Sequence, residues 1–289
     1  MVAGKHAPDV INMDGKYLAD YGGRGVLADL SALKGIDLSS LSEADKQAGT
    51  WDGKLYALTT GSNAFAIPSI LAKAGVCVPD DSTWTWDDLL SISKTVSQKA
   101  GNGIVGMTGG GTYADLTIFL RQKGEDLCSK SGAGFTPETC AAWLTWYVDL
   151  RPPSFTGKAK DNGLFLKASM FWSIASTTKY PEAAATFVNF LLNDPDAAAI
   201  QLVNRGVPSS PAVLRAMDSK LTATDKDVIA WLKKVAPEIG SAPAIQPKGT
   251  SDFQNTIARE LSNVRFKKTT PLQSATALKD ALDSMAAKG

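Results

Sequence analysis

KASMFWSIASTTKYPEAAATFVNFLL, residues 167–192, is the most informative segment of this chain. Its first part, residues 169–176, mixes aromatic and small residues and predicts a strand or loop with an exposed Trp172. After a polar turn, Pro181 and Glu182 indicate a helix start, because proline and an acidic residue suit the first helical turn. Apolar residues at helical spacing then follow at Ala184, Phe187, Val188 and Leu191. The segment therefore predicts a strand or loop followed by a packed helix.

The composition is that of a globular protein large enough for two lobes. The chain has 289 residues, of which 44% are hydrophobic and 20% charged. Its 30 basic and 29 acidic residues leave a formal charge of +1, which gives no electrostatic reason to expect nucleic acid or an anionic membrane as partner. No apolar run reaches the roughly 20 residues that a membrane span needs, and residues 1–6 lack the hydrophobic region of a signal peptide. A neutral small ligand fits this charge balance best.

Three other stretches accompany the segment in chain order. They are residues 7–14 (APDVINMD), residues 51–58 (WDGKLYAL) leading to Asn63, and residues 71–76 (LAKAGV) leading to residues 84–89 (WTWDDL). Together with residues 169–179 they resemble the sugar-binding proteins that serve ABC importers, a carbohydrate-binding family similar to maltose-binding protein. The resemblance covers most of the chain. Against the family, the chain looks short before residue 2 and near residues 65–68 and 151–153, so we expect either an incomplete copy or a sequence numbered across gaps.

The resemblance implies an α/β fold of the type II periplasmic-binding-protein kind, in which two lobes close by hinge motion over a cleft. We expect one lobe from residues 1–64 and 166–206 and the other from residues 65–165 and 207–289. It also implies a non-catalytic monomer, periplasmic or extracellular and lipid-anchored or free, that binds a carbohydrate and delivers it to a membrane permease. No cofactor is expected.

Several polar and aromatic residues are candidates for the sugar site. Asp14 follows a short predicted strand; alone it is best explained as a helix cap, whereas the resemblance favours a ligand contact. Asn63 lies where the family crosses between lobes, and a turn asparagine is an equally good interpretation. The glycine-rich loop at residues 108–113 precedes a predicted helix, so that Gly110, Thr112 and Tyr113 could contact a sugar, or the loop could be a plain turn.

Two further candidates come from the resemblance alone. In the family, the region of residues 249–253 approaches the ligand, which selects Ser251 and Phe253. With Trp172 for stacking on a sugar face, the predicted site combines carboxylate, amide, hydroxyl and aromatic groups. Trp172 could also be an ordinary core residue.

The three cysteines admit two interpretations. Cys128 and Cys140 flank a glycine-containing loop whose closure by a disulfide would be worth roughly 3 kcal/mol in the chain-entropy model. Two reduced, buried thiols are about as compatible with the sequence, and the resemblance to an exported family favours the bridge. Cys77 is expected to be a small core residue.

The alternative function is a serine acyl-transferase of the β-lactam-recognising kind. Ser176 and Lys179 match the S-x-x-K motif, in which the lysine helps to activate the serine. The other two motifs of those enzymes are absent, and Lys179 precedes a helix instead of lying within one. The single histidine, His6, and cysteines without C-x-x-C spacing predict no metal site.

Overall fold

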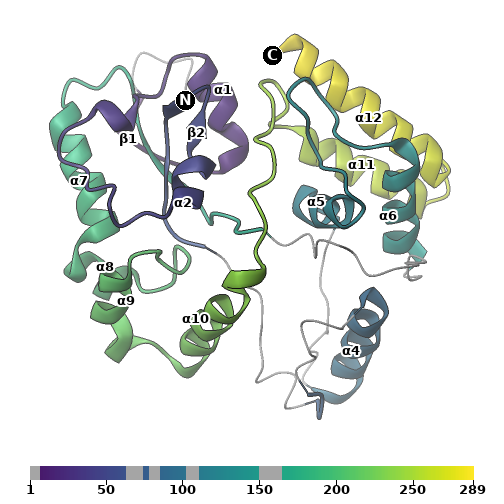
Figure 1. Ribbon diagram of the computed structural model, residues 1–289. Helices are drawn as coiled ribbons and strands as arrows, with labels where there is room; N and C mark the ends of the chain where they lie inside the picture. The colour runs from purple at the N-terminus through teal and green to yellow at the C-terminus, as the bar shows by residue number, and fades with distance from the viewer. Residues whose placement is uncertain (1–6, 63–73, 78–84, 102–110, 150–164) are drawn as a thin grey trace.

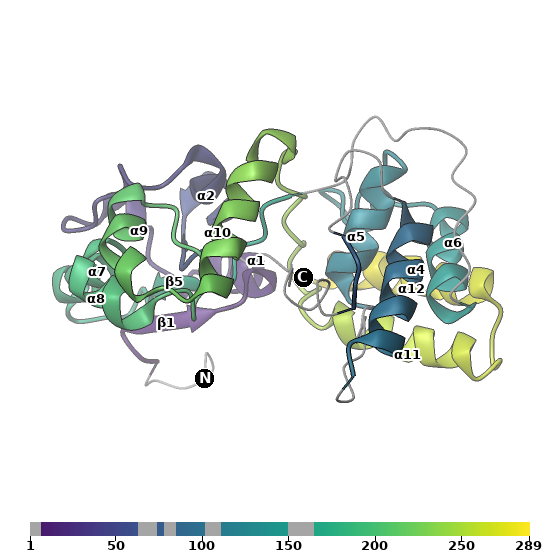
Figure 2. The same ribbon diagram turned by 90° about the horizontal axis from the view of Figure 1, so that it is seen from below.

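The computed structural model describes residues 7–62, 74–77, 85–101, 111–149 and 165–289. These residues form two lobes joined by extended chain segments (Figures 1 and 2). One lobe holds the small sheets and the other, in its described part, is helical. Asn63 and Gly110 lie outside the described residues.

The sheet of the first lobe is built from distant parts of the chain. Its strands are β1 (Val10–Met13), β4 (Leu58–Thr59) and β5 (Phe171–Ile174), all antiparallel in the order β1-β5-β4. In the register, Trp172 of the central strand lies opposite Asn12 on one side and Leu58 on the other. Residues 169–176 therefore contain the central strand of this lobe.

Helices cover both faces of this sheet. On one face, α7 (Pro181–Asn193) packs Ala184 and Val188 against Ile174, while on the other α1 (Leu18–Gly23) packs Leu18 against Met13. Helix α7 begins at Pro181, which confirms the predicted start. The other helical elements of the lobe are η1 (Gly15–Tyr17), η2 (Leu30–Ala32), α2 (Glu43–Ala48), α8 (Pro195–Gln201), α9 (Pro211–Met217), η3 (Asp218–Lys220), α10 (Ala223–Val235) and η4 (Ala236–Glu238).

A tight hairpin joins β2 (Thr50–Trp51) to β3 (Lys54–Leu55). Asp52 and Gly53 both have positive φ angles, 49° and 75°, as the inner residues of a type I′ turn require. An Asp-Gly pair is typical of this turn, because both residues tolerate positive φ.

The second lobe is a helical assembly around Trp143, which has no exposed surface. Its helices are α4 (Trp86–Lys99), α5 (Tyr113–Gln122), α6 (Pro137–Asp149), α11 (Phe253–Arg265) and α12 (Pro271–Lys288). Phe119 of α5, Ile257 of α11 and Leu278 of α12 are fully buried around it. The C-terminal helices thus complete a core begun more than a hundred residues earlier.

The predicted lobe boundary at residue 207 differs from the structure. Val213 and Met217 of α9 pack against Ala198 of α8, which keeps α9 with the first lobe. Figure 2 shows α10 beside α9 on the same side of the molecule. The chain passes into the second lobe only after η4, through residues 239–252. Helix α9 stays with the first lobe because its apolar face already packs against α8.

Cys128 and Cys140 are free thiols, so the predicted disulfide is not formed. Each packs as a small hydrophobic residue in the core of the second lobe, at 3% and 0% exposure. Burial raises the pKa of both thiols to about 12, with smaller contributions from Asp126 for Cys128 and from Glu125 for Cys140. Cys77 was expected in the core, but it is exposed.

Thiol titration is expected to separate these cysteines. In the folded protein at pH 8, Cys77 should react rapidly with a thiol reagent, whereas Cys128 and Cys140 should react only after unfolding. The raised pKa means that the folded state keeps protons that the unfolded state loses, so the thiols' contribution to stability should fall as pH rises above about 8.5. A non-reducing peptide map that links Cys128 to Cys140 would contradict this result.

Candidate ligand-binding site

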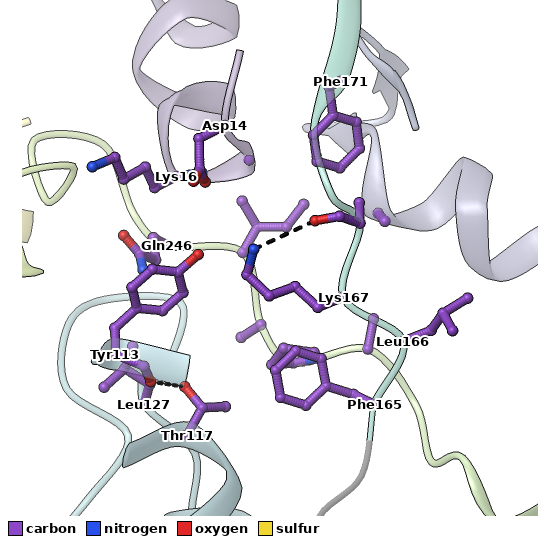
Figure 3. Close-up of a pocket in the computed structure, with 17 residues that line it drawn as sticks. Asp14, Lys16, Tyr113, Thr117, Leu127, Phe165, Leu166, Lys167, Phe171 and Gln246 are labelled. Atoms are coloured by element: carbon purple, nitrogen blue, oxygen red, sulfur yellow. Dashed lines mark hydrogen bonds between the residues drawn. The ribbon is translucent and has the colours of Figure 1, made fainter. Parts of the chain in front are cut away.

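A cavity of about 120 Å³ lies where the two lobes and their connecting segments meet. Its walls come from the turn after β1, from α5, from residues 165–171 and from residues 242–246 (Figure 3). Most of the lining groups are apolar, with a few polar side chains among them. This combination is typical of a small-molecule site.

Asp14 supplies a carboxylate to this cavity. It ends β1 and caps η1, since Oδ1 accepts a hydrogen bond from the Lys16 backbone N–H at 3.1 Å. Among the described residues no group donates to Oδ2. The two explanations for Asp14 are therefore compatible: the same side chain caps a helical turn and faces the cavity.

Tyr113 enters the cavity from the second lobe. Its main chain is fixed at the start of α5, where its N–H donates to Gln254 Oε1 at 2.8 Å and its carbonyl accepts from the Thr117 hydroxyl at 2.7 Å. Burial raises the pKa of Tyr113, and the negative charge of Asp14 adds to this effect. The phenol therefore stays protonated and can donate a hydrogen bond across the cavity.

Phe171 provides the aromatic wall. It lies against Gly15, where an added Cβ would stand 2.9 Å from Phe171 Cε2. A side chain at position 15 would therefore displace the ring. The close approach of Gly15 lets Phe171 and Asp14 border the same space (Figure 3).

Trp172 does not line the cavity, contrary to the sequence prediction. Successive side chains of a strand point to opposite faces, so Trp172 lies on the other side of β5 from Phe171. It packs against the core formed with Ile174, Ala185 and Val188. Within this aromatic segment, the residue that borders the cavity is Phe171 and not Trp172.

The remaining predicted residues lie elsewhere. Phe253 is 1% exposed in the core of the second lobe, because the start of α11 turns its side chain inward. Ser251 is half-buried and Thr112 is the exposed cap of α5; neither borders the cavity. Thr112 contributes by fixing the helix start that presents Tyr113.

Some lining residues were not anticipated from the sequence. Phe165, Lys167 and Gln246 border the cavity from the connecting segments. Arg121 holds these segments to α5, because its Nη2 donates to the Ser241 carbonyl at 2.7 Å and its guanidinium lies 5.8 Å from the Phe165 ring centre. The sequence of the connecting segments shows no periodic pattern of polar and apolar residues, so nothing in it indicated Phe165, Lys167 or Gln246.

The acyl-transferase arrangement is not supported by the geometry. Ser176 Oγ donates to the Gly25 carbonyl at 2.7 Å, and Ser176 and Lys179 lie in the exposed turn before α7. Within the described ranges, no group of three or more histidine, cysteine or acidic side chains could hold a metal ion. Over the same ranges, the helices are too short or too polar to span a bilayer.

Comparison with known proteins relates this chain to bacterial solute-binding proteins. The family model of bacterial extracellular solute-binding proteins matches residues 1–169, more than half of the 289 residues. An extracellular solute-binding protein of family 1 from Alicyclobacillus acidocaldarius shares 26% identity and a TM-score of 0.66, over 99% of this chain and 85% of that one.

Two further structures are similar in fold. The periplasmic oligogalacturonide-binding protein of Yersinia enterocolitica, in complex with saturated digalacturonic acid, has a TM-score of 0.73 at 20% identity, over 99% of this chain and 87% of that one. The GacH receptor of Streptomyces glaucescens, studied with acarbose, has a TM-score of 0.67 at 17% identity, over 97% and 84% of the two chains.

Proposed function

Because the chain belongs to the bacterial extracellular solute-binding proteins, we propose that it binds a sugar or oligosaccharide between its lobes and delivers it to the permease of an ABC importer. Family membership and similarity in fold confirm the expected two-lobed type II fold and the expected extracellular or periplasmic class. The proposal for this chain's own ligand rests on its cavity.

The observation that supports it is the meeting of Asp14, Tyr113 and Phe171 around one space. A sugar offers hydroxyl groups to a carboxylate and a phenol, and an apolar C–H face to an aromatic ring. Asp14 and Phe171 belong to one lobe and Tyr113 to the other. A ligand held by all three would therefore bridge the lobes and favour their closure by hinge motion.

The size of the cavity suits one sugar ring or one end of a longer chain. Its volume of about 120 Å³ is smaller than the roughly 300 Å³ at which drug-sized ligand sites begin. The oligogalacturonide-binding protein and the acarbose-binding GacH receptor support an oligosaccharide as ligand, since both share this fold. The connecting segments at residues 165–168 and 242–246 line the cavity, so lobe movement would change its width.

Isothermal titration calorimetry with a panel of mono- and oligosaccharides tests the proposal. We expect saturable binding of one sugar class, and at least about tenfold weaker binding by Asp14→Ala, equal to a loss of about 1.4 kcal/mol. Asp29→Ala is the matched control, because Asp29 caps η2 through the same contact, from Ser31 N–H to Oδ1 at 3.1 Å, away from the cavity.

Two results would contradict the proposal. One is the absence of heat with every sugar while the protein remains folded. The other is equal loss of affinity in Asp14→Ala and Asp29→Ala, which would reduce Asp14 to a capping residue. A β-lactam included in the panel should neither bind nor modify Ser176.

A further inference from the structure

Lys167 carries a cationic group into the cavity. It lies in the connecting segment just before β5, and its ammonium points into the space between Asp14, Tyr113 and Phe171 (Figure 3). The ammonium donates one long hydrogen bond, 3.4 Å, to the carbonyl of Ala168. An ammonium has three N–H donors, so this contact leaves capacity for a ligand.

No acidic side chain of the described residues forms an ion pair with Lys167. Asp14, which lines the same cavity, instead directs Oδ1 to the Lys16 N–H. The ammonium of Lys16 is placed 5.0 Å from the Tyr17 ring centre and turns away from the middle of the cavity (Figure 3). Lys167 is therefore the cation that a bound molecule would meet.

Of the charged groups around the cavity, the Lys167 ammonium is the cation that reaches its middle, and the Lys16 ammonium turns away from it. The charged lining residues are Asp14, Lys16 and Lys167, one acidic and two basic, and the other walls are largely apolar. A cation held in apolar surroundings is stabilised by a negative partner and costs free energy without one. A ligand carboxylate would supply the direct ionic partner that Lys167 lacks among the described residues.

We infer that Lys167 makes this site selective for a carboxylate-bearing sugar, a uronate, over its neutral counterpart. The inference rests on the proposed function and specifies its substrate class. Lys167 and the phenol of Tyr113 would donate to the carboxylate oxygens, while Asp14 accepts from a ring hydroxyl. A single carboxylate matches the one ammonium of Lys167, whereas a phosphate ester would bring nearly two negative charges to it.

Calorimetry with glucuronate, galacturonate and mannuronate mono- and disaccharides, each paired with its uncharged methyl ester, tests the inference. At least one acid should bind tenfold or more tightly than its ester at low salt, and rising salt should reduce this preference. Lys167→Gln should weaken acid binding at least about tenfold more than ester binding, so that the preference for the acid is lost. The control Lys179→Gln removes an exposed lysine of the same lobe and should change neither.

The outcomes separate the inference from the proposed function. Equal binding of acid and ester, or binding of neutral sugars alone, would overturn the uronate preference while sugar binding stands. Equal weakening of both ligands by Lys167→Gln would make Lys167 a structural residue and also overturn it. No binding of any sugar by the folded protein would overturn both. Circular dichroism melting curves confirm that each variant is folded.

Discussion

Gly49→Ala is expected to lower the free energy of unfolding by about 3 kcal/mol or more, among the largest effects of a single methyl group in this protein. Gly49 is the C-cap of α2, and its carbonyl accepts from the N–H groups of Tyr56 and Ala57 at 3.0 and 3.2 Å. A Cβ at position 49 would overlap the Ala57 carbonyl oxygen and stand 2.8 Å from its carbon. Because the obstacle is main chain, relief requires movement of β4 away from α2.

Urea unfolding followed by circular dichroism measures this effect. Gly53→Ala, four residues away in the turn between β2 and β3, serves as a comparison. Gly53 has φ of +75° with open space around it, so alanine there should cost only about 1 to 2 kcal/mol for the left-handed conformation. Gly49 has φ of −98°, which alanine adopts readily, so a loss of less than about 1 kcal/mol in Gly49→Ala would mean that the contact with the Ala57 carbonyl does not constrain this position.

Trp172→Ala is expected to lower the free energy of unfolding by about 2 to 3 kcal/mol, while sugar affinity changes less than about threefold. The side chain is half-buried between the central strand and α7, against Ile174, Ala185 and Val188. Its removal leaves a cavity in the first lobe but takes nothing from the binding cavity.

Thermal melting and calorimetric titration on the same sample separate the two quantities. Phe187→Ala is a suitable control, since Phe187 lies on α7 but is 50% exposed, and its loss should cost less than about 1 kcal/mol. A tenfold loss of sugar affinity with unchanged stability in Trp172→Ala would mean that Trp172 contacts the ligand.

Local features were predictable because neighbouring residues determine them. The start of α7 at Pro181 and the type I′ turn at Asp52-Gly53 follow from rules that involve only a few adjacent residues. Asp14 was selected through the family resemblance, at the end of a predicted strand, and Tyr113 through a glycine-rich loop before a predicted helix; the structure brings both to one cavity. Strand and helix ends often border ligand sites, which is why the sequence was informative at these two positions.

The errors share a cause. Phe171 and Trp172 are adjacent aromatic residues, and only the partners packed on each face of β5 decide which of them borders the cavity. Cys128 and Cys140 have a spacing compatible with a disulfide or with two core thiols, and the surrounding apolar side chains decide between them. In both cases the deciding contacts come from residues far away in the chain.

By itself, the sequence indicated the family, a strand or loop at residues 169–176 and the helix that follows it, and it selected Asp14 and Tyr113, which line the cavity. The tertiary structure alone decided the orientation of Phe171, the packing of α9 on the first lobe and the convergence of Lys167 with residues 242–246. Local patterns specify backbone conformation through short-range sterics and hydrogen bonds. Long-range packing determines which face of an element is buried, and this requires the folded partners to be in place.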